Sequence, residues 1–160
     1  MSHRVLQTAR TAYRIGDPDG RFPIWDDGGA RLFSGRWHLA GDPVIYASAG
    51  YSTAMLEKLA HHSGDIPANQ HFIQITIPAN TTSEVFAPHQ APDWHSPESP
   101  GAGAFGHQWV LARRSAILFV PSILAPKKMN ILFDTAHPEF AGVTIGLETP
   151  VYWDARQFDR

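Results

Sequence analysis

The stretch His71–Ile77 reads His-Phe-Ile-Gln-Ile-Thr-Ile and carries the clearest strand pattern in the chain. Isoleucine occupies every second position, with Gln74 and Thr76 between. Successive side chains of a β-strand point to opposite faces, so this alternation places all the isoleucines on one face. The pattern therefore predicts a strand with one apolar and one polar face.

Outward from this strand, the sequence predicts three further short strands. They are expected at Thr11–Ile15, Pro43–Ala47 and Ala116–Val120. The last stretch is apolar throughout, which is typical of a buried strand.

A helix is predicted over Ser52–His62, with Ser52 as its N-cap and Gly64 as the residue that stops it. Its apolar stripe comprises Met55, Leu56 and Leu59. Glu57 lies in the middle of the helix, one position past Leu56.

The segments between these elements are rich in turn-forming residues, in a chain with 13 glycines and 13 prolines. Asp17–Gly35 and Phe86–Gly106 are expected to be irregular, and Gly106–Arg114 to form a second helix. Strands and helices do not alternate as a doubly wound sheet requires, so the predicted class is α+β. Because the sequence shows neither a repeat nor a linker, residues 1–160 are expected to form a single domain.

Charge and composition exclude several classes of function. The formal net charge is −2 and no segment gathers Lys and Arg, so a nucleic-acid partner is not expected. The absence of cysteine excludes disulfides and a cysteine nucleophile and fits a reducing cytosol. Met1–Arg14 lacks the apolar centre of a signal peptide, and the longest apolar run, Ala116–Pro121, is far shorter than the ~20 residues of a membrane span. We therefore expect a soluble, cytoplasmic protein.

The stretch Gly101–Gly106 matches the G-x-G-x-x-G pattern of dinucleotide-binding loops. That fingerprint needs a strand immediately before it and an acidic residue about 20 positions later. Here Pro97 and Pro100 precede it, and Pro121–Lys127 contains neither Asp nor Glu. The stretch is predicted to be a flexible loop and not a Rossmann site.

Two other site types find no support in the residue spacing. The nine histidines include no H-E-x-x-H motif, and the adjacent His61 and His62 would point about 100° apart on a helix. There is also no G-x-S-x-G sequence for a serine hydrolase. We expect no catalytic metal and no cofactor.

A scattered polar set among aromatic residues remains as the candidate site. It consists of Arg14, Arg36, Tyr46, Glu57 and Ser122. Each has an ordinary structural interpretation when taken singly: surface arginines lie over rings, a tyrosine ends a strand, and a serine follows a proline in a turn.

Taken in order, these residues and their neighbours resemble the RES-domain family, which is named for its Arg, Glu and Ser positions. The resemblance begins with Tyr13-Arg14, Gly35-Arg36-Trp37, the stretch from Pro43 to Ala47, and Leu56-Glu57 on the helix. It continues through Asp93-Trp94, Gly106 with Trp109, Val120-Pro121-Ser122, Asn130, His137-Pro138 with Phe140, and Asp154-Ala155-Arg156. It covers nearly the whole chain.

The resemblance implies an ADP-ribosyltransferase-like fold, with small twisted sheets flanked by short helices, and NAD+ as the substrate. Arg14 and Arg36 would bind the pyrophosphate, Tyr46 would pack against the nicotinamide end, and Glu57 would be the catalytic carboxylate. Arg14 and Tyr46 would share in catalysis, and Ser122 would help to shape the NAD+ site. The family's members are toxins of toxin–antitoxin pairs. A Xre-like DNA-binding antitoxin is therefore expected to block the pocket in a hetero-oligomeric complex.

The residue types suit cleavage of the nicotinamide–ribose bond. Positive charge develops on the ribose in the transition state, so one carboxylate can stabilise it electrostatically. Nicotinamide leaves as a neutral molecule and needs no general acid. The planar guanidinium of arginine matches phosphate oxygens.

Two positions depart from the family's common pattern and leave the acceptor open. Ser34-Gly35-Arg36-Trp37-His38 stands where Gly-Gly-Arg-Trp-Asn is common, and Asp134 stands where Asn is common. ADP-ribose could pass to water or phosphate, which is the leading hypothesis, or to a cellular protein. A module that binds a nucleotide or a protein without catalysis is a further alternative.

Overall fold

The computed structural model describes residues 4–61 and 65–158. Most of the regular structure is β. The strands are β1 (Arg4–Val5), β2 (Arg10–Gly16), β3 (Val44–Ser48), β4 (His71–Ile77), β5 (Thr82–Val85), β6 (Ile117–Pro121), β7 (Met129–Asp134), β8 (Thr144–Ile145) and β9 (Thr149–Pro150). The α-helices are α1 (Gly28–Leu32), α2 (Tyr51–Ala60) and α3 (Pro100–Leu111), and short 3-10 turns occupy Pro88–Gln90, Pro138–Gly142 and Ala155–Gln157.

The strands form one mixed sheet in the order β1-β5-β6-β7-β3-β2-β4-β8, and β9 also pairs with β4. Every pairing is antiparallel except that of β5 with β6. The predicted α+β class is confirmed. The strand predicted over His71–Ile77 has those bounds in the structure, and its three isoleucines are buried.

The sheet is nearly split between β2 and β3. Their register contains one residue pair, Tyr13 with Ser48, whereas β2 pairs with β4 over seven residues and β3 with β7 over five. The two strands therefore diverge beyond that point. The divergence leaves main-chain groups of β3 without a strand partner and opens space at the middle of the sheet.

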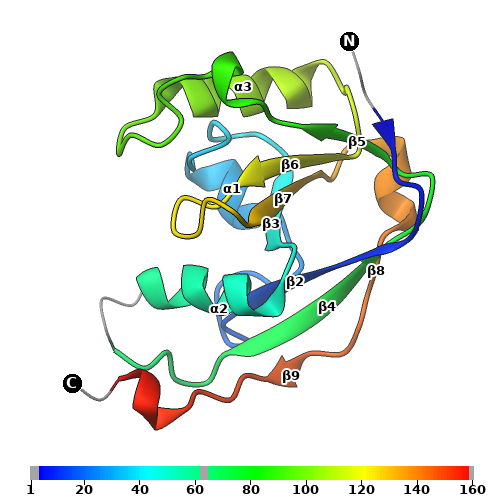
Figure 1. The fold of residues 1–160 in the computed structure, drawn as a ribbon. Coiled ribbons are helices and arrows are strands. Elements are labelled where there is room, and N and C mark those ends of the chain that lie inside the picture. The colour runs from blue at the N-terminus through cyan, green and yellow to red at the C-terminus, as the bar shows by residue number, and fades with distance from the viewer. Residues whose placement is uncertain (1–3, 62–64, 159–160) are drawn as a thin grey trace.

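The β6–β7–β3 part of the sheet is a middle layer with a core on each face. Ile117, Phe119, Ile131 and Phe133 pack toward the isoleucines of β4, whereas Leu118, Val120 and Leu132 pack toward α3. Figure 1 shows α3 along one side of this layer and β2 and β4 on the other. Burial on both faces explains why Ala116–Val120 is apolar throughout.

The prediction of a flexible loop over Gly101–Gly106 was wrong, because these residues form the first half of α3. Ser99 caps the helix by accepting a hydrogen bond from the Ala102 amide (3.3 Å), and Pro100 is its first residue. A β-carbon at Gly106 would overlap the carbonyl oxygen of Trp37. Gly106 therefore serves close helix packing, and the helix begins six residues before the expected Gly106.

The predicted helix over Ser52–His62 exists, but its cap and its inward face differ. It begins at Tyr51 with Gly50 as N-cap, so Ser52 lies inside the first turn, and it ends at Ala60. Leu56 is 40% exposed, whereas Thr53 and Ala54 are buried. His62 and the expected stop at Gly64 lie outside the described residues.

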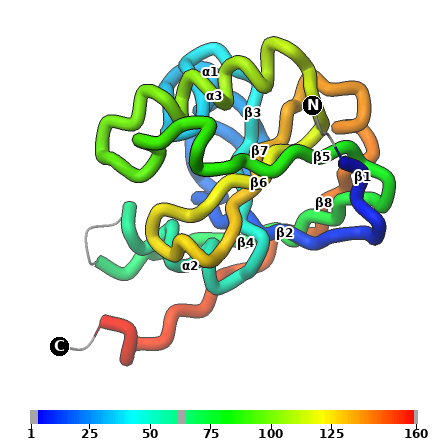
Figure 2. The backbone as a smooth tube through the Cα atoms, turned by 45° about the horizontal axis from the view of Figure 1, so that its top comes forward, coloured from blue at the N-terminus to red at the C-terminus, as the bar shows by residue number. Residues whose placement is uncertain are grey.

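Two segments expected to be irregular contain short helical pieces. Asp17–Gly35 includes α1, and Phe86–Gly106 includes the turn Pro88–Gln90 before α3 begins. The turn between β6 and β7 lies beside α2 (Figures 1 and 2), which brings Ser122 to the middle of that helix. None of the helices in the described part of the chain has the length and apolarity to cross a membrane.

Candidate functional site

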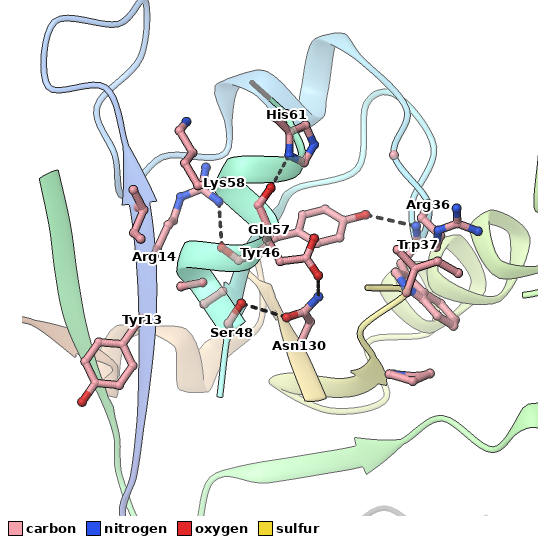
Figure 3. Close-up of a pocket in the computed structure, with 16 residues that line it drawn as sticks. Tyr13, Arg14, Arg36, Trp37, Tyr46, Ser48, Glu57, Lys58, His61 and Asn130 are labelled. Carbon is pink, nitrogen blue, oxygen red and sulfur yellow. Dashed lines mark hydrogen bonds between the residues drawn. The ribbon is translucent and has the colours of Figure 1, made fainter. Parts of the chain in front are cut away.

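A pocket of about 550 Å³ opens where β2 and β3 diverge. β2, β3, α2 and the segment around Trp37 supply most of its walls, and the β6–β7 region closes it (Figure 3). It is lined by Tyr13, Arg14, Ile15, Gly35, Arg36, Trp37, Tyr46, Ala47, Ser48, Ala54, Glu57, Lys58, His61, Pro121, Ile123 and Asn130. Segments far apart in the sequence thus meet at one place.

The face of α2 that lines the pocket is largely polar. Ala54, Glu57, Lys58 and His61 follow the i, i+3, i+4, i+7 spacing of one helix face. His61 follows the helix and donates from Nδ1 to the carbonyl oxygen of Glu57 (2.7 Å), which fixes its ring beside the last turn. The inward face was missed because an apolar stripe is the usual sign of burial, and here the inward residues serve the pocket.

One oxygen of the Glu57 carboxylate is held from behind. Ser122 Oγ donates to Glu57 Oε1 (2.7 Å), and Asn130 Nδ2 donates to the same oxygen (2.9 Å). Asn130 is itself oriented because its Oδ1 accepts from Ser48 Oγ (2.8 Å). Oε2 accepts no hydrogen bond from any residue in the described ranges. The carboxylate therefore has a fixed orientation and one oxygen left for a ligand.

Ser122 lies behind Glu57 and not in the pocket wall. Its side chain is fully buried, and its Oγ also accepts from the amides of Leu124 and Ala125 (3.2 Å each). With two acceptor bonds made, its proton is directed at Glu57. Its predicted part in NAD+ binding stays a prediction, and the geometry supports an indirect part through Glu57.

Arg14 bridges the gap between the diverging strands. Its Nη1 donates to the carbonyl oxygen of Tyr46 on β3 (2.7 Å), and its Nε donates to that of Ile24 (2.6 Å). Burial lowers the pKa of the Arg14 guanidinium to about 10, and the nearby Asp26 carboxylate opposes that shift. Arg14 remains charged at neutral pH, on the wall of the pocket.

Lys58 lies next to Arg14 on the same side of the pocket (Figure 3). Burial lowers the pKa of Lys58, the positive charge of Arg14 lowers it further, and Asp17 opposes both. Among the described residues, the ion pairs within 4.0 Å include none that uses Arg14, Arg36 or Lys58. Such a cluster of cations favours an anionic ligand.

Arg36 lies across the pocket from Arg14, next to Trp37 (Figure 3). Its Nη1 donates to the carbonyl oxygens of Trp94 and Ser96 (2.7 Å each). These bonds fix the guanidinium against the segment before α3. Trp37 is buried and packs edge-on against Phe86 at 4.6 Å between ring centroids.

Tyr46 contributes its ring to the pocket and turns its hydroxyl away from Glu57 (Figure 3). The hydroxyl accepts a hydrogen bond from the Trp37 amide (3.1 Å) and lies 2.7 Å from His38 Nδ1. Burial raises the pKa of the Tyr46 hydroxyl well above its usual range. The hydroxyl is therefore neutral, and the ring is what a ligand meets.

The structure brings four of the five sequence-predicted site residues into the lining of one pocket: Arg14, Arg36, Tyr46 and Glu57. Sequence reasoning missed Lys58, His61 and Ser48 as parts of the site, and it gave Asn130 no role in it. The spacing of Lys58 and His61 from Glu57 on one helix was a usable signal. No local pattern reveals Ser48 and Asn130, because they meet only through the pairing of β3 with β7.

The site of this small α+β protein combines a single oriented carboxylate with cations and an aromatic ring. Such a pocket suits a polar anionic ligand. Among the described residues, no group of three His, Asp or Glu side chains could hold a metal ion.

Comparison with known proteins gives the family. The RES domain model matches residues 11–154, and the chain belongs to the RES domain family, as its sequence resemblance predicted. It is 33% identical over 145 residues to the Prs ADP-ribosylating toxin of Sphingobium sp. (strain YBL2), covering 88% of this chain and 85% of that protein. It is 35% identical over 136 residues to a protein named Toxin Res from Pseudomonas putida (strain KT2440), covering 82% and 90%.

The fold also matches a solved structure. A chain in the crystal structure of the M. tuberculosis MbcT-MbcA toxin–antitoxin complex superposes with a TM-score of 0.72, over 92% of this chain and 86% of that one. The sequence identity is 16%, so this likeness shows the shared fold.

Proposed function

We propose that this protein is the toxin of a toxin–antitoxin pair and that it cleaves NAD+ at the nicotinamide–ribose bond. The observation that carries the proposal is the Glu57 carboxylate, held through Oε1 by Ser122 and Asn130 with Oε2 left toward a cationic pocket. Membership of the RES domain family and the toxin names of its relatives support it. We place its action in the cytoplasm, which fits the absence of cysteine.

The proposed reaction breaks the bond between the nicotinamide nitrogen and C1′ of the ribose, and the electron pair leaves with neutral nicotinamide. Positive charge then develops on the ribose ring, and Glu57 stabilises it through a negative charge fixed before the reaction begins. Water or inorganic phosphate adds to C1′ and releases a proton. The products are nicotinamide with ADP-ribose, or nicotinamide with phosphorylated ADP-ribose.

Binding roles follow from the walls of the pocket. Arg14 and Lys58 on one side and Arg36 on the other would neutralise the diphosphate, which carries two negative charges. The Tyr46 ring would pack against the nicotinamide end, and its hydroxyl, whose pKa is raised by burial, would not act as a base at neutral pH. Ser122, Asn130 and Ser48 would orient Glu57, and Ser122 would do so from outside the pocket lining.

Transfer of ADP-ribose to a protein is the second candidate reaction. It is favoured by one observation, namely that a relative covering 88% of this chain is named an ADP-ribosylating toxin. The same carboxylate would serve both reactions, because only the acceptor at C1′ differs.

We further propose that an antitoxin neutralises this protein by occupying the pocket, and we retain the Xre-like class as its expected type. The toxin–antitoxin structure that shares this fold supports such a partner. The cations of the pocket would favour an acidic or carboxylate-bearing segment of the antitoxin.

The test is to incubate the purified protein with NAD+ in buffers with and without phosphate and to identify the products. Nicotinamide with ADP-ribose or phosphorylated ADP-ribose is expected, and the product names the acceptor. If release is slow, the same protein is added to a cell lysate with NAD+ labelled in its adenylate part. Labelled protein would establish the second candidate reaction. If NAD+ remains intact and no protein is labelled, the enzymatic proposal is wrong and a binding module remains.

A further inference from the structure

His38 lies behind Tyr46, outside the pocket lining, and the residue is almost fully buried at 3% exposure. Its Nε2 lies 3.0 Å from the carbonyl oxygen of Ala30 and 2.8 Å from that of Phe33. Carbonyl oxygens only accept, so Nε2 must carry a proton. These contacts tie His38 to the C-terminal end of α1.

The other ring nitrogen then has a defined role. In the neutral ring with the proton on Nε2, Nδ1 is an acceptor, and the Tyr46 hydroxyl at 2.7 Å donates to it. The same hydroxyl accepts from the Trp37 amide. The proton of the Tyr46 hydroxyl is therefore committed to His38 and unavailable to a ligand.

Close packing leaves this pair little freedom to rearrange. A β-carbon at Gly35 would lie 2.8 Å from His38 Cε1 and 3.0 Å from the Tyr46 hydroxyl. Gly35 and His38 also form an isolated antiparallel bridge. The backbone on both sides of Arg36 and Trp37 is thus folded tightly against the His38–Tyr46 pair.

We infer that His38 is a positioning residue, which locks the Tyr46 hydroxyl so that Tyr46 serves the reaction through its ring. The inference rests on the proposed function for the reaction that it affects. It assigns no contact with substrate to His38, which acts through Tyr46. It also links α1 to the site, because the ring is held at one nitrogen by α1 and at the other by Tyr46.

The inference predicts a specific pattern among variants. Tyr46→Phe keeps the ring and loses the lock, so kcat for nicotinamide release should fall by about tenfold, the scale of one positioned hydrogen bond. Tyr46→Ala removes the ring, so its kcat for nicotinamide release should be much lower still. His38→Asn offers a side-chain oxygen as an acceptor and should retain most of the activity. The kcat of His38→Leu should fall as far as that of Tyr46→Phe.

A double-mutant cycle separates positioning from general support of the fold. If His38 acts through the Tyr46 hydroxyl, His38→Leu should lower kcat about tenfold in the wild-type background and have almost no effect in Tyr46→Phe. His107→Leu is the matched control, because His107 lies on α3 and contacts Asp42 and not Tyr46. Its effect should be the same in both backgrounds. Additive losses for His38→Leu, or a Tyr46→Phe loss as large as that of Tyr46→Ala, would overturn the inference.

A second measurement does not depend on turnover or on the folding of the Leu variant. Nitrogen-15 NMR of the histidines in the wild-type protein should show His38 with its proton on Nε2 and a bare Nδ1. The Nδ1 signal should change in Tyr46→Phe, where its donor is gone. A His38 protonated on Nδ1 would overturn the inference even if NAD+ is cleaved. If the expected tautomer is found and NAD+ stays intact, the proposed function fails and the His38–Tyr46 lock stands.

Discussion

Glu57 is oriented through one carboxylate oxygen, and the residues that do this lie on β3, on β7 and in the turn between β6 and β7. Hydrogen bonds to a charged group are stronger than those between neutral groups and set its direction. A carboxylate held this way needs little reorganisation when positive charge develops on the substrate. At the residue scale, the site depends on the neutral donors around Glu57 as much as on Glu57 itself.

Asn130 gives a direct test of that orientation. Asn130→Asp replaces the donor 2.9 Å from Glu57 Oε1 with a second carboxylate, which repels Glu57 and favours its protonation. We expect kcat for nicotinamide release to fall by about 100-fold with a smaller change in KM, an effect on the scale of losing one oriented donor. Ser48→Ala is the milder comparison, since it removes only the bond to Asn130 Oδ1. An unchanged kcat in Asn130→Asp would contradict the role of this network.

The lowered pKa of Lys58 predicts how KM for NAD+ changes with pH. The pKa of Lys58 is lowered by burial and by Arg14, so its amine loses its proton at a lower pH than a free lysine. Phosphate binds the protonated form, so affinity is present below the pKa and lost as pH rises through it. We therefore expect KM for NAD+ to rise in the alkaline range in the wild type, and Lys58→Arg to flatten that rise.

Removal of the Lys58 charge should act on binding rather than on chemistry. Lys58→Met is expected to raise KM about tenfold at neutral pH while kcat changes little, the pattern of a lost phosphate contact. Lys127→Met is the matched control, because Lys127 is exposed and outside the pocket lining. Equal KM values for the two variants would show that Lys58 does not contact the phosphates.

Among the elements, α3 can lie close to the Trp37 segment because Gly106 has no side chain. A β-carbon at Gly106 would overlap the Trp37 carbonyl oxygen, and that carbonyl belongs to the segment that carries Arg36. The helix must therefore move away if this glycine is replaced. Movement of α3 would disturb the aromatic cluster around Trp37 and the adjoining pocket wall.

Gly106→Ala is expected to lower the free energy of unfolding by about 3 kcal/mol, the upper range for an overpacked core position. Gly29→Ala in α1 is the matched control, because a β-carbon there meets nothing within 4 Å. Alanine is favoured over glycine inside a helix, so this variant should be unchanged or more stable by up to about 1 kcal/mol. Urea unfolding of both variants measures the difference. Equal stability of the two would show that α3 does not depend on this close approach.

The elements that sequence reasoning placed correctly are those whose pattern is local. β4 has the period of a half-buried strand, and β6 is a short apolar run. The helical form of Gly101–Gly106 could not be predicted from local sequence, because Gly106 is explained by its close approach to the backbone of Trp37, which lies far away in the sequence. The exposure of Leu56 could not be predicted locally either, because the inward face of α2 lines the pocket and does not pack against an apolar core.

The family resemblance predicted which residues belong to the site. The structure added the contacts between them, which no sequence motif contains. Arg14, Arg36, Tyr46 and Glu57 were expected, and all line the pocket. That Arg14 would also replace a missing strand partner of β3 follows only from the divergence of β2 and β3. The commitment of the Tyr46 hydroxyl to His38 likewise needs the three-dimensional structure.

At the scale of the whole molecule, a ligand in the pocket would join two parts of a nearly split sheet. β2 and β3 share one residue pair, and Arg14 and Tyr46 face the pocket from these two strands. Binding to the folded state alone stabilises it in proportion to RT ln(1 + [L]/Kd). The stability of the molecule should therefore respond to phosphate-bearing ligands.

ADP should raise the melting temperature of the variant Glu57→Gln, in which we expect NAD+ cleavage to be lost. At 100 times Kd the expected gain is about 2.7 kcal/mol, or roughly 5–10 °C for a chain of this size. Adenosine, which lacks the phosphates, should give a much smaller shift, and Lys58→Met should reduce the shift with ADP. Equal shifts with ADP and adenosine would indicate that the cations of the pocket do not bind phosphate.

We expect Glu57 to drive cleavage of NAD+ in a pocket that binds the dinucleotide independently of that carboxylate. The most direct measurement compares NAD+ binding by calorimetry and nicotinamide release by chromatography in the wild type and Glu57→Gln. We predict similar affinities, release of nicotinamide by the wild type, and a loss of release of at least about 100-fold in Glu57→Gln. Undiminished release in Glu57→Gln would show that Glu57 does not drive cleavage, and tight NAD+ binding with no cleavage by the wild type would show that the protein is a binding module.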